Sequence, residues 1–256
     1  MQAENFRLDD YLKRIGFEGA PKADLDSLTR LMQGQVRSVP FENLDVQAGK
    51  LVSIKPEDIV AKIVPTTRGG YCYEVNSLFA MALAAIGIPY SIAGARPMSY
   101  PTKWARTHMV ILAEVEGERY LCDAGYGGLG LRQPLNLATL DTPVQQDRDT
   151  YRLIRDGDDY IVQAIISGDK AEWGNAYSFN TSPFDLVDFV PANYYNSTHP
   201  DAVFVQKLLL VRHTKTGRHI LAGSLLKSFE DGAMTIRSVD KNELPGLVAD
   251  LFGLQL

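Results

Sequence analysis

The hydrophobic pattern of the chain changes from a helical period to a strand period near Tyr90. Upstream of that point, the segment after Cys72 repeats apolar residues on one helical face, at Val75, Leu78, Phe79, Ala82, Leu83 and Ile86. This spacing predicts a helix, and Gly87 followed by Pro89 predicts its end. Downstream, short apolar segments separated by glycine-containing turns predict antiparallel strands. The chain is therefore expected to join a helical part to a sheet.

Two hairpins carry most of the predicted sheet. Residues 108–125 are expected to turn at Glu116-Gly117, and residues 150–166 around Gly157. Three more strands are expected at 204–211, 218–223 and 233–238, with a closing helix at 242–252. Further helices are expected around residues 25–32 and 59–64. Helices first and strands second indicate an α+β fold.

The composition favours a protein that handles small molecules. The 256 residues are 45% hydrophobic, which allows a large core, and their net charge of −5 comes without clusters of Lys or Arg. Nucleic acid is therefore not expected as a partner. The first residues lack an apolar signal segment, and no stretch approaches the about 18 to 20 apolar residues of a membrane span, so we expect a cytoplasmic protein. In that compartment Cys72 and Cys122 are expected to be free thiols.

Cys72 lies in the stretch RGGYCYEVN, behind two glycines and at the predicted start of a helix. Unpaired backbone N–H groups and the positive end of the helix dipole favour a thiolate at such a position. Gly69 and Gly70 allow a tight turn and the close approach of a substrate carbonyl to the backbone. The alternative is a buried structural thiol, which is the common fate of a free cysteine.

The first hairpin predicts partners for this thiol. With a two-residue turn, His108 and Asp123 lie on one face as diagonal neighbours about 7–8 Å apart. A carboxylate there would orient the imidazole and stabilise its charged form. Cys122 points to the opposite face and is expected to be a core thiol. A three-residue turn would place His108 and Asp123 on opposite faces. Each residue also has a purely structural alternative: His108 as a hydrogen-bonded histidine of the sheet, and Asp123 as an acidic residue of a turn.

The loop DAGYGGLG, residues 123–130, has neither the pattern of a phosphate-binding loop nor that of a dinucleotide fold. Gly125 and Gly127 are expected to let a substrate approach the backbone, with Tyr126 as an aromatic wall, and a plain turn is the alternative. The remaining histidines, at 199, 213 and 219, show no metal-ligand spacing, so no metal site is expected.

These motifs, in this order, resemble those of the arylamine N-acetyltransferases. RGGYCYE resembles that family's cysteine motif, VPFENL its upstream signature, and THMVIL and DAGYG its histidine and aspartate motifs. STHPDAVFVQKLLLVR and LFGLQL are also similar, so the likeness runs through nearly the whole chain. Val75 and Tyr126 depart from the family pattern, at positions that bear on the choice of acceptor.

The resemblance implies a cysteine-protease-like core in three parts. These are a helical bundle with the cysteine (1–88), an antiparallel β-barrel with the histidine and aspartate (89–190), and an α/β lid (191–256). It implies Cys72 as acyl acceptor, His108 as base and Asp123 as orienting acid. It also implies substrate contacts from the family's pocket positions, at Phe41, Thr107, Tyr126 and Phe204, and contacts with the coenzyme A thiol arm at Gly125 and Gly127. An ion pair between Arg68 and Glu42 is expected to brace the loop before Cys72.

The resemblance further implies ping-pong acetyl transfer from acetyl-coenzyme A, a co-substrate rather than a resident cofactor, to an arylamine or arylhydrazine. Three alternatives use the same residues differently. An amide synthase would move a larger acyl chain, and a cysteine amidase or hydrolase would pass the acyl group to water or lysine. A small-molecule binding protein would carry an inert thiol.

Overall fold

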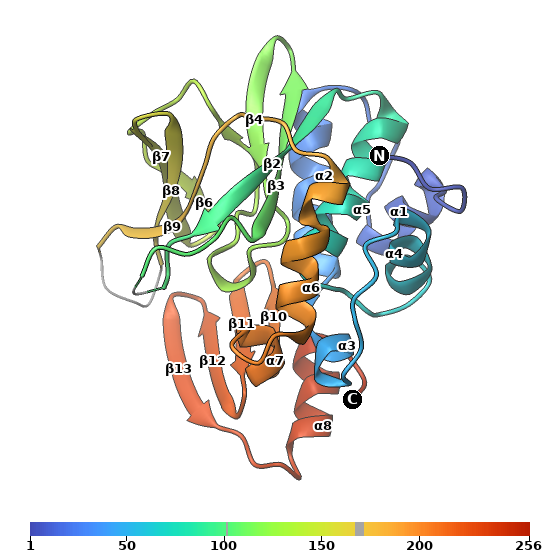
Figure 1. Ribbon diagram of the computed structural model, residues 1–256, viewed down its shortest axis with the longest axis vertical. Helices are drawn as coiled ribbons and strands as arrows, with labels where there is room; N and C mark the ends of the chain where they lie inside the picture. The colour runs from blue at the N-terminus through green and yellow to red at the C-terminus, as the bar shows by residue number, and fades with distance from the viewer. Residues whose placement is uncertain (101, 167–171) are drawn as a thin grey trace.

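The computed structural model describes residues 1–100, 102–166 and 172–256 (Figure 1). Its helices are α1 (Leu8–Ile15), α2 (Leu25–Ser38), α3 (Leu44–Gln47), α4 (Pro56–Ile63), α5 (Cys72–Ile86), α6 (Val190–Thr198), α7 (Val203–Gln206) and α8 (Leu244–Leu247). Short helical segments are η1 (Gly127–Leu129), η2 (Leu186–Phe189) and η3 (Val248–Phe252). None of the helices in these ranges is both long and apolar enough to cross a membrane.

The strands form two antiparallel sheets. The larger, barrel-like sheet has the order β5 (Leu135–Asn136), β4 (Glu118–Cys122), β3 (His108–Val115), β2 (Tyr90–Pro97), β9 (Gly174–Phe179), β8 (Asp159–Ile165), β7 (Asp149–Asp156), β6 (Val144–Gln146). The smaller has the order β1 (Phe41–Glu42), β10 (Leu209–His213), β11 (Gly217–Ala222), β12 (Leu225–Glu230), β13 (Ala233–Ser238). The predicted combination of helices followed by strands is confirmed.

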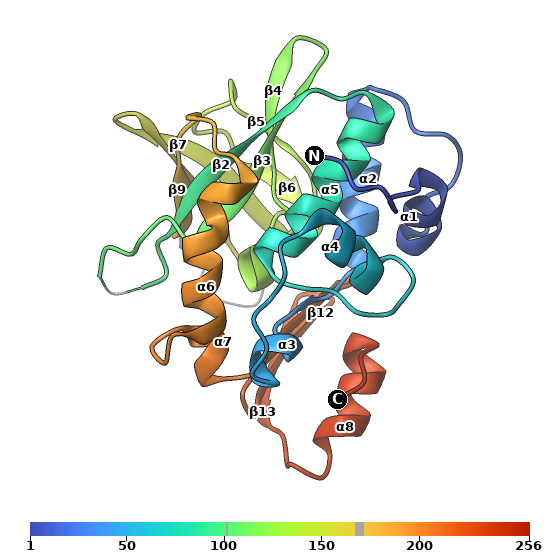
Figure 2. The ribbon, with the colours of Figure 1, turned by 45° about the vertical axis from the view of Figure 1, so that its right-hand side comes forward.

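Helix α5 lies at the centre of the main core. Every residue from Cys72 to Leu83 is buried, because the helix is apolar on nearly all sides and is covered on each of them. It contacts α1, α2 and α4 on one side and β3 on the other, as Figure 2 shows. It ends at Gly87, whose φ of 80° is left-handed. The segment predicted as the central helix therefore joins the helices to the barrel-like sheet.

The hairpin that carries the candidate histidine and aspartate has the predicted register. Val115 pairs with Glu118 across the two-residue turn, and Glu114 faces Arg119 with their side-chain atoms 3.5 Å apart. The second predicted hairpin also forms, with a turn between Asp156 and Asp159. A two-residue turn fixes every later pair, so the faces of both strands follow from it.

Three features of the smaller sheet differ from the prediction. Val203–Gln206 forms helix α7 where the expected strand 204–211 was to begin, and that strand starts only at Leu209. Strand β12 was not predicted, because its buried residues, Leu226 and Phe229, are three positions apart and give no alternation. Strand β1 comes from the N-terminal, mainly helical region, yet it pairs with β10, so that Phe41 faces Val211.

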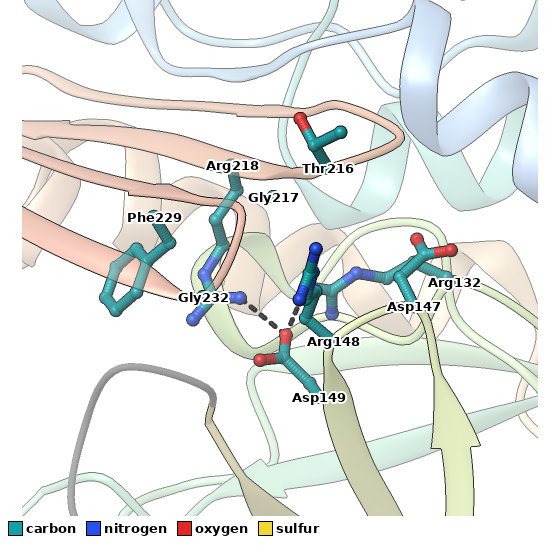
Figure 3. A pocket seen from close by; sticks show the side chains of 9 residues that line it. All are labelled: Arg132, Asp147, Arg148, Asp149, Thr216, Gly217, Arg218, Phe229 and Gly232. Carbon is teal, nitrogen blue, oxygen red and sulfur yellow. Dashed lines mark hydrogen bonds and ion pairs between the residues drawn. The ribbon is translucent and has the colours of Figure 1, made fainter.

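A buried ionic cluster connects the two sheets. Arg132 and Arg218 both donate to the same carboxylate oxygen of Asp149, which lies on β7, while Arg218 comes from β11 (Figure 3). All three side chains are at most 3% exposed. The ring of Phe229 covers the guanidinium of Arg218 at 4.1 Å. A carboxylate shared by two buried cations therefore holds the smaller sheet against the larger one.

We expect Asp149→Asn to lower the free energy of unfolding by about 3–5 kcal/mol, because it leaves two buried guanidinium groups without their counter-charge. Denaturant unfolding of the purified protein measures this. The control is Asp231→Asn, which removes an exposed partner of Arg148 and should change the same quantity by less than about 1 kcal/mol. Equal effects of the two substitutions would contradict the assignment.

Candidate active site

Cys72 is the first residue of α5 and is only 4% exposed. The turn before it is held from two directions. The N–H of Tyr71 donates to the Glu74 carboxylate at 3.1 Å, and the Tyr71 hydroxyl contacts Asn193 and Ser197 on α6. The start of the helix is therefore fixed both within α5 and against a distant helix, and the thiol has a defined position.

His108 and Asp123 contact each other as the hairpin register predicts. His108 Nε2 lies 2.8 Å from Asp123 Oδ2, and both side chains are buried. Cys122 lies on the opposite face, fully buried, with its sulfur 3.9 Å from the Tyr120 carbonyl oxygen. Burial raises the pKa of the Cys122 thiol. Cys122 is thus a core thiol outside this arrangement.

The charges of the pair support each other. Burial alone would lower the pKa of His108, but the carboxylate of Asp123 and, to a lesser degree, the neighbouring Cys72 outweigh it and raise the pKa to about 10. Burial likewise opposes ionisation of Asp123, yet its pKa stays below the usual value, because His108 and the donors Asn76 and Gly125 stabilise the carboxylate. The imidazole is therefore held in its charged form beside Cys72.

Asn76 ties the end of β4 to the first turns of α5. Its Nδ2 donates to the Met109 carbonyl at 2.7 Å and to Asp123 Oδ1 at 3.1 Å, and its Oδ1 accepts from the N–H of Ala124 at 2.9 Å. Asn76 was not among the predicted site residues. Its position four residues after Cys72, on the same face of the helix, was the available signal.

Gly125 is required by this close approach. A Cβ atom there would lie 2.8 Å from the Cys72 Cα and 2.7 Å from the Val75 Cγ2, which is too short for a real contact. Gly70 is similarly confined, since its Cβ would lie 2.4 Å from Glu74 Oε2. Both glycines are thus required by neighbouring protein atoms, a constraint that the sequence did not reveal. Val75 packs under Gly125, away from the cavity wall.

A cavity of about 320 Å³ opens onto Cys72 and His108. All four predicted substrate-contacting residues line it: Phe41, Thr107, Tyr126 and Phe204. The rings of Phe41 and Phe204 are 6.0 Å apart, and that of Tyr126 meets His108 edge-on at 4.9 Å. These residues come from β1, the loop before β3, the loop after β4, and α7, so the cavity brings together distant parts of the chain.

The glycines after β4 lie differently from the prediction, and two further residues of the cavity wall were not predicted. Gly125 and Gly128 line the cavity, whereas Gly127 lies behind it, with its carbonyl 3.0 Å from His213 Nε2 and its φ at 74°. Tyr100 and Asn196 also line it and were not predicted. Asn196 donates to the Tyr73 hydroxyl at 3.1 Å, which makes it a fixed polar group on α6. Neither residue lies in a motif that marks it.

The predicted ion pair before Cys72 is present, with Arg68 Nε 2.8 Å from Glu42 Oε1. Arg68 also contacts Asp45 at 3.0 Å.

Within residues 1–100, 102–166 and 172–256, no group of three or more His, Cys, Asp or Glu side chains is arranged to hold a metal ion.

The chain matches known proteins over nearly its whole length. The N-acetyltransferase family model matches residues 24–256. The arylamine N-acetyltransferase of Mycolicibacterium smegmatis is 36% identical, over 97% of this chain and 92% of that protein. The structure of the Mycobacterium abscessus arylamine N-acetyltransferase superposes with a TM-score of 0.92 at 27% identity, over 99% of this chain and 91% of that one. The structure of the Mycobacterium marinum arylamine N-acetyltransferase in complex with CoA superposes with a TM-score of 0.89 at 32% identity, over 96% of this chain and 92% of that one.

These matches cover the segments that bear Cys72, His108 and Asp123 as well as the whole fold. The protein is a transferase. It belongs to the arylamine N-acetyltransferase family.

We expect the imidazole of His108 to titrate near pH 10, and at a much lower pH in Asp123→Asn, because the substitution removes the anion that outweighs burial. Since the folded pKa is raised above 6.5, the stabilisation from this proton is complete below about pH 6.5 and is lost as the pH rises through 10. Nitrogen NMR of the histidine rings measures both titrations. A His108 that loses its proton below pH 7 in the unsubstituted protein would contradict the assigned pair.

We expect Gly125→Ala to push the loop after β4 off α5 and to cost about 1–3 kcal/mol of unfolding free energy. The pKa of His108 should fall with it, because Asp123 moves with the loop. Denaturant unfolding and the same NMR titration measure the two effects. Gly246→Ala is the matched control, since a Cβ there meets no atom within 4 Å.

Proposed function

We propose that the protein transfers an acetyl group from acetyl-coenzyme A to an arylamine or arylhydrazine nitrogen in two steps, through an acetyl-cysteine at Cys72. The observation that supports this most directly is the position of Cys72 and His108 in one cavity wall, with Asp123 directly behind His108 at 2.8 Å. This is the geometry that nucleophilic catalysis by a thiol needs: a nucleophile, a base and a group that orients the base.

In the first step, the thiolate of Cys72 attacks the carbonyl carbon of the acetyl thioester. The carbonyl electrons move to oxygen, return, and expel coenzyme A, which leaves as a thiol after taking the proton of His108. Exchange of one thioester for another is nearly isoenergetic, so the protein mainly has to orient the donor and keep the thiolate ready.

In the second step, the amine nitrogen attacks the acetyl-cysteine, the C–S bond breaks, and His108 takes the proton that the amine loses. An aromatic amine suits this step because it is largely unprotonated near pH 7. The aromatic walls from Phe41, Tyr126 and Phe204 would favour flat acceptors and limit the hydrolysis of the intermediate by water.

The CoA complex of the Mycobacterium marinum relative supports acetyl-coenzyme A as the donor here. We assign its thiol arm to the wall made by Gly125 and Gly128, with Gly127 behind them, and the acceptor to Phe41, Thr107, Tyr126 and Phe204. A cysteine-protease-like core divided at residues 88 and 190 fits this reading: the thiol comes from the helical part, the imidazole and carboxylate from the barrel, and one aromatic wall from the C-terminal part.

Intact mass spectrometry after mixing with acetyl-coenzyme A tests the proposal. We expect the protein to gain one acetyl group, to lose it when an arylamine is added, and to gain none in Cys72→Ala. Cys122→Ala is the matched control and should still be acetylated, because that thiol is buried on the other face of the hairpin.

Two outcomes would replace the proposal. Absence of any mass gain in the unsubstituted protein would exclude an acetyl-cysteine. Release of acetate at the same rate with and without arylamine would favour a hydrolase that uses the same three residues.

In Asp123→Asn, acetyl transfer should fall by about 10³-fold or more, because an amide beside His108 Nε2 selects the wrong tautomer.

A further inference from the structure

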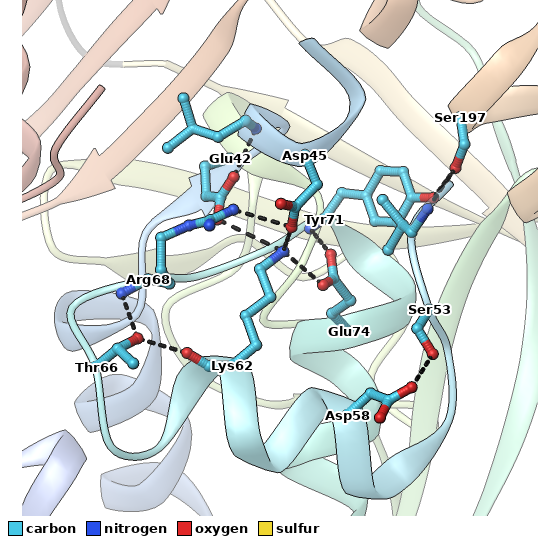
Figure 4. A network of polar contacts seen from close by, with 12 residues as sticks. Glu42, Asp45, Ser53, Asp58, Lys62, Thr66, Arg68, Tyr71, Glu74 and Ser197 are labelled. Atoms are coloured by element: carbon cyan, nitrogen blue, oxygen red, sulfur yellow. Dashed lines mark hydrogen bonds and ion pairs between the residues drawn. The ribbon is translucent and has the colours of Figure 1, made fainter. Parts of the chain in front are cut away.

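Lys62, on α4, inserts its ammonium group among three carboxylates from three other elements (Figure 4). Its Nζ lies 2.7 Å from Glu74 on α5, 2.6 Å from Asp45 on α3 and 3.6 Å from Glu42 on β1. The Lys62 side chain is 16% exposed, and those of Glu42 and Glu74 are 0% and 2% exposed. Charges removed from water to this extent interact strongly.

Glu74 is the member of this group that belongs to the start of α5. One carboxylate oxygen accepts from Lys62, and the other accepts from the N–H of Tyr71 at 3.1 Å, directly before Cys72. The same oxygen fills the space where Gly70 has no Cβ. The Glu74 carboxylate therefore holds the turn that presents Cys72, and this hydrogen bond is strongest when the carboxylate is ionised.

The ionisation of Glu74 depends on Lys62. Burial raises the pKa of Glu74 to about 7, the ammonium of Lys62 opposes that rise, and the carboxylate of Glu42 adds to it. The second cation, Arg68, contacts Glu42 and Asp45. Of the described residues, Lys62 is the one whose charged group contacts Glu74. Three carboxylates share two cations, so loss of Lys62 leaves Glu74 with a net negative neighbourhood.

We propose that Lys62 is a positioning residue for the catalytic cysteine: by holding Glu74 as a carboxylate, it keeps the Tyr71–Cys72 turn in its reactive geometry. The inference rests on the proposed role of Cys72 as acyl acceptor. It gives the cluster of Lys62, Glu42, Asp45, Arg68 and Glu74 a part in the reaction, without contact between Lys62 and a substrate.

The test measures the rate at which iodoacetamide alkylates Cys72 across the neutral pH range. The result for each variant is expressed as the ratio of its rate to that of the unsubstituted protein. In Lys62→Met we expect the ratio to fall about tenfold near pH 7 and to recover at higher pH, where Glu74 ionises again. Lys62→Arg keeps the charge and should stay near unity. Lys55→Met is the matched control, because Lys55 is exposed at the start of the same helix.

The double variant separates positioning from a loss of packing. Because Lys62 acts through Glu74, Cys72 should be alkylated no more slowly in Lys62→Met/Glu74→Gln than in Glu74→Gln alone. In the double variant the alkylation rate should not recover at high pH. For Glu74→Gln alone, the ratio of alkylation rates should approach unity below pH 7, where the native carboxylate is also protonated. Above pH 7 the ratio should fall. Where Lys62→Met fails to fold, Glu74→Gln still tests the inference, because an alkylation ratio that stays at unity above pH 7 would show that the charge of Glu74, through which Lys62 acts, does not position Cys72.

A Lys62→Met protein with an unchanged alkylation profile would overturn the inference, as would losses that multiply in the double variant. Alkylation requires no acetyl donor, so these outcomes are distinct from failure of the proposed function, which appears as absence of acetyl on Cys72 in the unsubstituted protein.

Discussion

The contact between the loop after β4 and the first turns of α5 is the constraint on which the rest of the structure depends. Only a glycine allows the loop to come this close to the helix, because a Cβ atom on Gly125 would lie 2.8 Å from the Cys72 Cα. Asn76 satisfies the polar groups that this approach buries, by bonding to Met109, Ala124 and Asp123. Thiol, imidazole and carboxylate are therefore brought together by backbone packing, and their hydrogen bonds complete the arrangement.

Two groups of charged side chains, one buried and one partly buried, flank the start of α5. On the sheet side, His108 and Asp123 form a pair that holds a proton beside the thiol. On the side of α4, Lys62 and Arg68 are shared among three carboxylates. Buried ion pairs add little to net stability once desolvation is counted, so their presence at the same helix terminus is better explained by positioning. Both groups adjoin one short segment, the turn from Gly70 to Cys72.

Much of this arrangement could be predicted from the sequence where local rules determine it. The two-residue turn at Glu116-Gly117 fixes the register of the hairpin, so the shared face of His108 and Asp123 and the opposite face of Cys122 followed from counting. The pairing of β1 with β10 could not be predicted, and of the cluster around Lys62 only the ion pair between Arg68 and Glu42 was, because the other contacts join residues on separate elements without a local rule. Strand β12 was missed since its burial does not alternate.

The carboxylate that Arg132 and Arg218 share has a consequence for how such a chain can evolve. Asp149 and Arg132 both belong to the region of the barrel-like sheet and form a neutral pair there, whereas Arg218 arrives with the smaller sheet and has its counter-charge in the other part of the molecule. A C-terminal segment that carries this buried cation can therefore be exchanged between relatives only where the receiving barrel-like sheet supplies an anion at the position of Asp149, while the ring that covers the cation, Phe229, comes with the segment itself.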